Sequence, residues 1–170
     1  MTAPQIHIKN LTINLRTAPP LLDGLPINWG EFVPGTLEKT EAPRFELSAD
    51  GATITDHKTG LMWAAGEETR VDDFDAALKL AKDCRLGGFD DWFIPDVDQL
   101  QTIVDRSRYS PATFTEVFKS TGNWVFTSTP YAGSSRSVWI VGFTYGVVNG
   151  YGRYGRAFAR PCRVAAPAGQ

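Results

Sequence analysis

Glycine alternates with aromatic residues through the last third of the chain, and this pattern restricts the fold there more than any other feature. Nine aromatic residues fall between Trp124 and Phe158, and five glycines fall among them between Gly142 and Gly155. Glycine weakens helices and supplies turns, whereas aromatic residues favour strands. The pattern therefore predicts short antiparallel strands joined by tight turns. Because side chains alternate between the two faces of a strand, we expect some aromatic residues to pack inward and others to be displayed.

The segment before this region reads as strands followed by two helices. RFEL, ATITD and LMWA are strand-like runs, separated by turns at 49–51 and 58–60. Apolar residues at helical spacing predict a helix at about 72–85, with Asp72 as its N-cap. Asp96 and Gln99 resemble a capping box and predict a second helix at about 97–105. Strands, two helices and further strands in this order indicate an α+β fold.

The first 43 residues have a different character from the rest. Apolar residues alternate through IHIKNLTINL in a strand-like pattern, and five prolines then follow between positions 19 and 43. We interpret 1–43 as an extended arm for docking or oligomerisation, 44–164 as the folded domain and 165–170 as a tail. The alternative is a strand that joins the domain's own sheet.

Composition excludes several classes of protein. The chain has 170 residues, 42% of them apolar, and a net charge of −2, which is typical of a globular domain and not of a disordered or collagenous chain. No run approaches the roughly 20 apolar residues of a membrane-spanning helix, so we expect no membrane insertion. The first residues lack a basic stretch followed by an apolar one, so no Sec signal peptide is visible.

The charges are distributed unevenly. Residues 1–118 hold all 19 acidic residues and 11 basic ones, whereas residues 119–170 hold six basic residues and no acid. A basic, acid-free third indicates a surface for an anionic partner. Alternatively, its arginines pair with carboxylates from the first two thirds. Nucleic acid is disfavoured as the partner because the rest of the chain is acidic.

Several blocks of sequence, in order, resemble the Lcl C-terminal domain family. They are TITDHKTGLMWA, LGGFDDWFIPDVDQLQTIVD, WVFTSTPY, VWIVGFTYG and ARPCRV. The resemblance covers roughly residues 44–164. Phe93 stands where the family usually has Arg, and Pro161 precedes Cys162 where Arg is usual.

The resemblance implies a C-type-lectin-like fold, similar to the formylglycine-generating-enzyme superfamily. Members occur in bacterial surface proteins and in phage tail regions, and one is the C-terminal domain of an adhesin that trimerises and binds sulfated glycans. By this resemblance we expect a homo-oligomer, with a trimer plausible, in a phage tail (virion) or at a cell surface. It would recognise a host surface glycan or surface protein, and residues 1–43 would join a larger tail assembly. Trp63, Trp92, Trp124 and Trp139 match family core positions.

In this fold the last hairpins form a display surface, so we look for the ligand-binding residues there. A tyrosine ring can stack on the apolar face of a sugar, and arginine can hold a carboxylate or sulfate with two hydrogen bonds. The candidate ligand-binding residues are Arg136, Tyr145, Asn149, Tyr151, Arg153, Tyr154 and Arg156. The alternative is a structural tail or baseplate protein, in which Tyr151 and Arg153 would be buried at a subunit interface.

Catalysis and metal binding have little support in the sequence. The chain has two histidines, His7 and His57, and neither has a cysteine or another histidine nearby at the spacing of metal ligands. The elements that carry Cys84 and Cys162 lie side by side in the resembling fold, so a disulfide is plausible, and two buried free thiols are the alternative. Their separation along the chain argues against the close cysteine pair of a formylglycine-generating enzyme. We therefore expect a non-enzymatic protein without a cofactor, with calcium as an alternative because lectins of this fold often use it.

Overall fold

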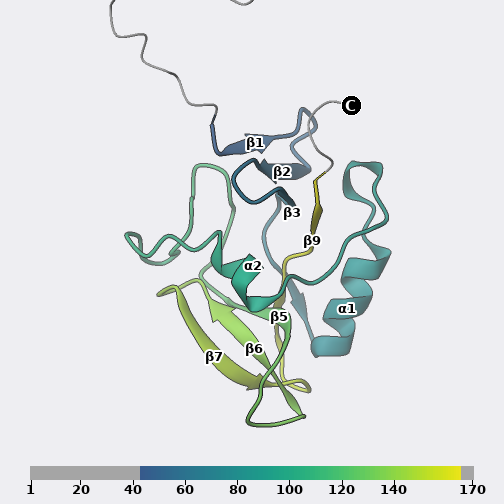
Figure 1. Cartoon of the computed structure of the whole chain (residues 1–170), viewed down its shortest axis with the longest axis vertical. Helices are drawn as coiled ribbons and strands as arrows, with labels where there is room; N and C mark the ends of the chain where they lie inside the picture. Colours follow the sequence, from purple (N-terminus) through teal and green to yellow (C-terminus); the bar gives the residue numbers. More distant parts are fainter. Residues whose placement is uncertain (1–42, 166–170) are drawn as a thin grey trace, which may run out of the picture. The chain divides into compact units, whose positions relative to one another are not determined.

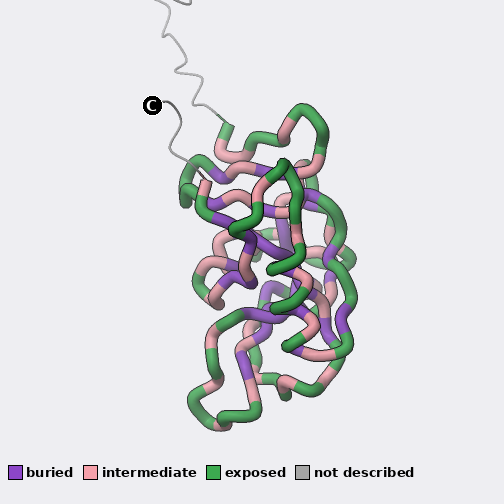
Figure 2. The backbone as a smooth tube through the Cα atoms, turned by 90° about the vertical axis from the view of Figure 1, so that its right-hand side faces the viewer, coloured by how far each residue is buried: buried purple, intermediate pink, exposed green. Residues whose placement is uncertain are grey.

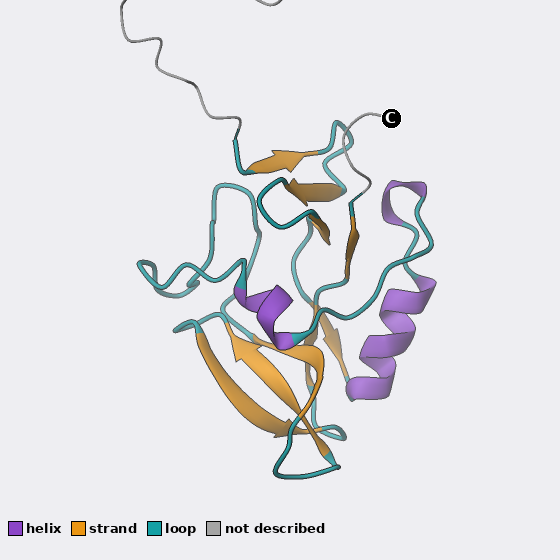
Figure 3. Ribbon diagram, viewed as in Figure 1, coloured by secondary structure: helices purple, strands orange, loops and turns teal. Residues whose placement is uncertain are grey.

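The computed structural model describes residues 43–165 (Figure 1). The predicted arm at 1–43 and tail at 165–170 lie almost wholly outside the described residues. The described part mixes α and β structure and is mostly sheet, with two α-helices, which agrees with the predicted α+β class (Figure 3). Within residues 43–165, no helix combines the length and apolar character needed to cross a bilayer.

The first sheet joins the two ends of the domain. It has the order β1-β2-β3-β9, with all neighbours antiparallel. Its strands are β1 (Phe45–Leu47), β2 (Thr53–Asp56), β3 (Leu61–Ala64) and β9 (Cys162–Val164). The turns between the first three contain Gly51 and Gly60, both at positive φ, which glycine adopts without strain. The sequence predicted β1, β2, β3 and both turns, and the structure confirms them.

The second sheet carries the aromatic and glycine-rich region. Its order is β4-β8-β5-β6-β7, and β7 is an edge strand. The strands are β4 (Thr69–Val71), β5 (Trp124–Pro130), β6 (Ser137–Gly142), β7 (Val147–Gly152) and β8 (Ala157–Ala159). β6 and β7 form a regular antiparallel hairpin that runs from the pair Gly142–Val147 to the pair Ser137–Gly152. The predicted short strands and tight turns are therefore confirmed, but one pair departs from the predicted antiparallel arrangement, because β5 and β8 run parallel.

Helix α1 (Phe74–Asp83) begins two residues later and ends two residues earlier than the predicted 72–85. Its N-cap is Asp73 and not Asp72, because the Asp73 carboxylate accepts a hydrogen bond from the Ala76 N–H at 2.8 Å. Asp72 instead faces Arg156. After α1 the chain makes a short 3₁₀ turn, η3 (Leu86–Gly88), which contains both glycines of the LGGFDDW block.

Helix α2 (Val97–Gln101) ends four residues before the predicted limit of 105. The capping box is confirmed: the Asp96 carboxylate accepts from the Gln99 N–H at 2.7 Å, and the Gln99 side chain accepts from the Asp96 N–H at 2.9 Å. The helix ends early because Val104 forms a β-bridge with Thr113. That tertiary contact draws the chain out of the helix.

Two clusters of buried side chains form the core. One lies between the two sheets around Trp63, Leu100 and Val141, and the other lies under α1 around Phe74, Phe126 and Ile140. Buried segments alternate with exposed turns along the chain (Figure 2). Trp63 and Trp92 are buried, as predicted. The expectation was wrong for Trp124, which is 40% exposed.

Candidate ligand-binding surface

The structure divides the predicted ligand-binding residues between the two ends of the β6–β7 hairpin. Tyr145 lies in the turn between the strands, beside the pair Gly142–Val147. Arg136 directly precedes β6 at the opposite end, where Arg153, Tyr154 and Arg156 follow β7. Asn149 and Tyr151 lie between these ends, on β7. The seven residues therefore do not form one cluster.

Hydrogen bonds between main-chain atoms hold the Arg136 end of the hairpin together. The Arg153 N–H donates to the Arg136 carbonyl at 2.8 Å, and the Phe74 N–H donates to the Arg153 carbonyl at 2.8 Å. Tyr154, the next residue, is 80% exposed. We call Arg136, Arg153, Tyr154 and Arg156 the hairpin-end surface. It stands on a backbone that is fixed both to β6 and to the start of α1.

Carboxylates from the first two thirds of the chain pair with four of the six cations in residues 119–170. The pairs are Arg153–Asp75, Arg156–Asp72, Arg160–Glu68 and Arg163–Asp91. Most arginines of the basic last third therefore pair with carboxylates of the first two thirds, which was the alternative prediction. They do not form a continuous anion-binding surface. Within residues 43–165, only Lys119 and Arg136 of these six cations have no acid partner.

Arg160 and Arg163 are structural residues. The Arg160 guanidinium donates to the carbonyls of Ala64, Gly66 and Lys119 at 2.6–2.8 Å and pairs with Glu68, and both side chains are 1% exposed. Burial lowers the pKa of Arg160, and the charge of Glu68 opposes this shift. Arg163 donates to both Asp91 oxygens at 2.6 and 3.0 Å. That pairing holds the pKa of the Asp91 carboxyl below its usual range.

The pairs on the hairpin-end surface are weaker. The Arg153–Asp75 separation is 3.5 Å and the Arg156–Asp72 separation is 3.1 Å, and both aspartates are largely exposed. Exposed pairs of this kind contribute about 0–1 kcal/mol because water screens them. Both guanidinium groups can therefore exchange an aspartate for an external anion, whereas Arg160 and Arg163 cannot.

Two glycines of the aromatic region are required by rings that lie against them. A Cβ on Gly155 would stand 2.6 Å from the Tyr151 ring, and one on Gly150 would stand 2.9 Å from the Tyr131 ring. Tyr151 also donates a hydrogen bond to the Arg156 carbonyl at 3.3 Å and packs on Phe126. Tyr151 therefore helps to hold the local structure, and its removal would disturb the turn at 152–156.

Sequence reasoning missed the exposure of two aromatic residues, Tyr109 and Trp124. Tyr109 stacks on Tyr145 with ring centroids 5.8 Å apart, and the two residues are 71% and 66% exposed. The Ser110 N–H donates to the Thr144 carbonyl, which explains why these distant segments meet. No periodicity marks the loop that carries Tyr109. The exposure of Trp124 could have been suspected from its place at the start of a strand.

The two cysteines are free thiols in the structure, so the predicted disulfide is absent. Cys162 is buried in the core with Trp63, and its backbone pairs with Phe93 on the side away from β3. Cys84 follows α1 and lines a surface groove instead. Burial raises the pKa of the Cys162 thiol far above its usual range, which makes it a poor nucleophile. Within residues 43–165, no three His, Cys, Asp or Glu side chains gather closely enough to hold a metal ion.

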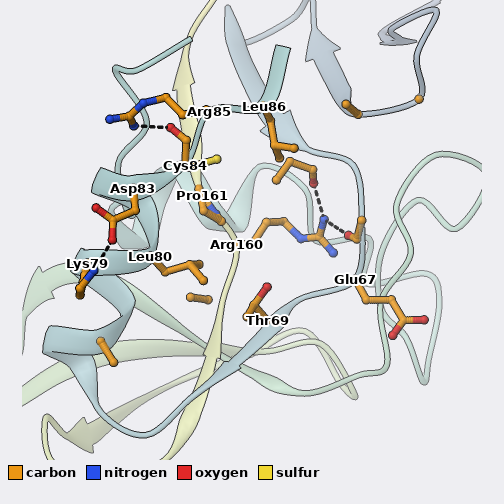
Figure 4. A pocket seen from close by; sticks show the side chains of 16 residues that line it. Glu67, Thr69, Lys79, Leu80, Asp83, Cys84, Arg85, Leu86, Arg160 and Pro161 are labelled. Atoms are coloured by element: carbon orange, nitrogen blue, oxygen red, sulfur yellow. Dashed lines mark hydrogen bonds and ion pairs between the residues drawn. The ribbon is translucent and has the colours of Figure 1, made fainter. Parts of the chain in front are cut away.

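The surface groove that Cys84 lines is a hollow of about 800 Å³ between α1 and the strands beside it (Figure 4). None of the predicted ligand-binding residues lines it. Its walls are largely small or apolar, as at Ala64 and Leu80, and two of its charged groups, Lys79 and Asp83, pair with each other. The groove could accept an apolar group, but it offers few polar atoms that would give specificity. The hairpin-end surface is therefore the stronger candidate.

The residues that carry the sequence resemblance meet in the fold. The LMWA block forms β3, the ARPCRV block ends in β9, and the Trp63–Cys162 pair joins them. A family model for the Lcl C-terminal domain matches residues 52–163, about two thirds of the chain. The chain belongs to the Lcl C-terminal domain family. No curated protein matches it in sequence.

The hairpin-end surface lies inside the region that matches the Lcl C-terminal domain. The two departures from the family pattern are close together and structural. Phe93 and Cys162 exchange main-chain hydrogen bonds at 2.8 and 2.9 Å, and the Pro161 carbonyl accepts from the Ala64 N–H at 3.1 Å. Neither departure touches the hairpin-end surface.

Proposed function

We propose that this Lcl C-terminal domain is a non-enzymatic binding module that recognises an acidic group on a cell-surface glycan through the hairpin-end surface. One observation carries the proposal. Arg136 is an exposed cation without an acid partner among residues 43–165, and it lies beside a turn that presents the almost fully exposed Tyr154. A fixed backbone that displays a guanidinium and an aromatic ring matches what binding loops provide.

The chemistry of the surface favours a carboxylate or sulfate on a sugar. The planar guanidinium of Arg136 can donate two parallel hydrogen bonds to such a group. Arg153 and Arg156 can add further donors because their pairs with Asp75 and Asp72 are weak and exposed. The Tyr154 ring offers an apolar face on which a sugar ring can stack.

The proposal includes a C-type-lectin-like fold and a role in attachment to a host cell. A fold of that kind brings the two ends of the domain side by side and displays its last hairpins, and the β3–β9 pairing and the β6–β7 hairpin fit this description. By the family resemblance, the setting would be a phage tail or a cell surface, and residues 1–43 would join the assembly.

The direct test is binding of the full chain to intact bacteria and to an array of bacterial glycans. The variant Arg136→Ala/Tyr154→Ala should lose about tenfold or more in affinity, since it removes a charge-assisted hydrogen bond and a stacking face. Lys119→Ala removes the other cation of the basic last third that has no acid partner among residues 43–165, and it should bind like the wild type. Periodate treatment of the cells, which destroys sugar diols, should abolish binding.

Three results would overturn this function. The double variant could bind as tightly as the wild type, binding could survive periodate but not protease treatment of the cells, or the folded chain could bind no glycan. The last result would favour the structural alternative. β7 supports that alternative, because it is an edge strand that pairs on one side only within the described part of the chain.

A further inference from the structure

The face of the β5–β6–β7 sheet that carries Tyr151 also carries an exposed tryptophan. Trp124 pairs with Gly142, which pairs with Val147, so the three residues share one face. Asn149 and Tyr151 follow Val147 at every second position of β7 and lie on the same face. Trp124, Val147 and Asn149 are all exposed. We call these three residues the β7 platform.

The Trp124 ring has a fixed position. It lies across Gly142, where a Cβ would stand 2.9–3.1 Å from three atoms of its six-membered ring. Only glycine at 142 allows this close approach. A large ring that is held flat and remains 40% exposed can be contacted without first being ordered, which lowers the entropic cost of binding.

The polar member of the β7 platform is an amide. The Asn149 Oδ1 accepts a hydrogen bond from the Gly150 N–H at 2.8 Å, so the side-chain amide is oriented and its NH₂ group can donate outward. The β7 platform itself has no charged residue. An apolar ring with an uncharged donor suits a neutral sugar ring better than an anion.

We propose that the β7 platform binds a neutral sugar of the same linear glycan whose acidic unit binds at the hairpin-end surface. This inference rests on the proposed function. The glycan would lie along β7, whose six residues span about 20 Å, long enough for several sugar units. The three arginines of the hairpin-end surface set its direction. At the other end of this line, Arg106 packs against Gly146 and its guanidinium donates a hydrogen bond to the Gln101 side chain at 2.9 Å.

The test is affinity as a function of ligand length. The probes are oligogalacturonates of two to eight sugars, in which methyl esterification neutralises all units but one terminal acid, and dextran oligomers of matched lengths that carry sulfate on one terminal unit only. Wild-type affinity should rise about three- to tenfold once the ligand reaches Trp124, and should then level off. Trp124→Ala should abolish this rise and leave the affinity for the shortest acidic ligand unchanged.

A second variant keeps the tryptophan but moves it. Gly142→Ala should displace the Trp124 ring and remove the same rise, whereas Gly152→Ala, where a Cβ meets nothing within 4 Å, should retain it. Circular dichroism and the thermal midpoint would identify a variant that has failed to fold.

The outcomes separate the two proposals. If Arg136→Ala weakens all lengths but length and Trp124 have no effect, the β7 platform is refuted and the proposed function stands. If Arg136→Ala has no effect, or no acidic oligosaccharide binds to the folded wild type, both are refuted.

Discussion

Arg160 and Arg136 are both arginines of the basic last third, yet the structure predicts opposite consequences of their removal. Arg160→Met would leave Glu68 buried without its ion-pair partner and three backbone carbonyls without their donor. Breaking a buried ion pair from one side costs about 3–5 kcal/mol. That is a large part of the 5–15 kcal/mol that stabilises a typical domain. For a domain of this size, the thermal midpoint should fall by roughly 10–20 °C.

The assay is urea unfolding followed by tryptophan fluorescence, with calorimetry for the midpoint. Arg136→Met is the matched control and should change the unfolding free energy by less than about 0.5 kcal/mol, because its side chain is exposed. Adding Glu68→Gln to Arg160→Met should restore part of the loss, since it neutralises the stranded buried charge. The reasoning fails if Arg160→Met is as stable as Arg136→Met, or if the added Glu68→Gln destabilises further.

Three further results are expected. Gly155→Ala should destabilise the fold by about 1–3 kcal/mol in urea unfolding because the new methyl group meets an aromatic ring, whereas Gly152→Ala should be nearly neutral; equal effects would contradict the packing. Because pairing with Arg163 lowers the pKa of Asp91, this pair stabilises the fold above about pH 4, and its contribution is lost as the pH falls below that value. The thermal midpoint should therefore drop more steeply in acid for the wild type than for Arg163→Met. One thiol per native chain, that of Cys84, should react with a chromogenic disulfide reagent, and a second should react only in denaturant; no reactive thiol in either condition would mean a disulfide.

Local signals in the sequence predicted the elements whose causes are local. Gly51 and Gly60 end strands because each supplies a turn at positive φ, and Asp96 with Gln99 starts α2 through contacts three residues apart. The N-cap of α1 was predicted one residue too early because two consecutive aspartates can both act as caps. Asp73 caps the helix, and the neighbouring carboxylate faces Arg156.

Features that depend on distant residues could not be predicted in this way. α2 stops early because Val104 pairs with Thr113, which has no mark in the helical periodicity. The basic last third resembled an anion-binding surface until Arg160 and Arg163 were found paired with carboxylates more than 70 residues away. Contacts of this kind decide which arginines remain for a ligand, so the candidate site could be located only after the fold was known.

The exposure of Trp124 also depends on residues that are distant in the sequence. As a family core position it was expected to be buried, but its place opposite Gly142 leaves it lying across the sheet with one part of the ring exposed. The resemblance predicted the strand, and only the register across β5, β6 and β7 indicated which face it occupies.

Backbone NMR of the ¹⁵N-labelled full chain, titrated with the partly esterified galacturonate octamer, tests the central claim most directly. The account predicts that the largest shifts occur at Arg136 and at 152–156, with smaller shifts along β7, and that Arg136→Ala removes them. Shifts that gather around the groove at Ala64 and Leu80, or no shifts at all, would contradict it.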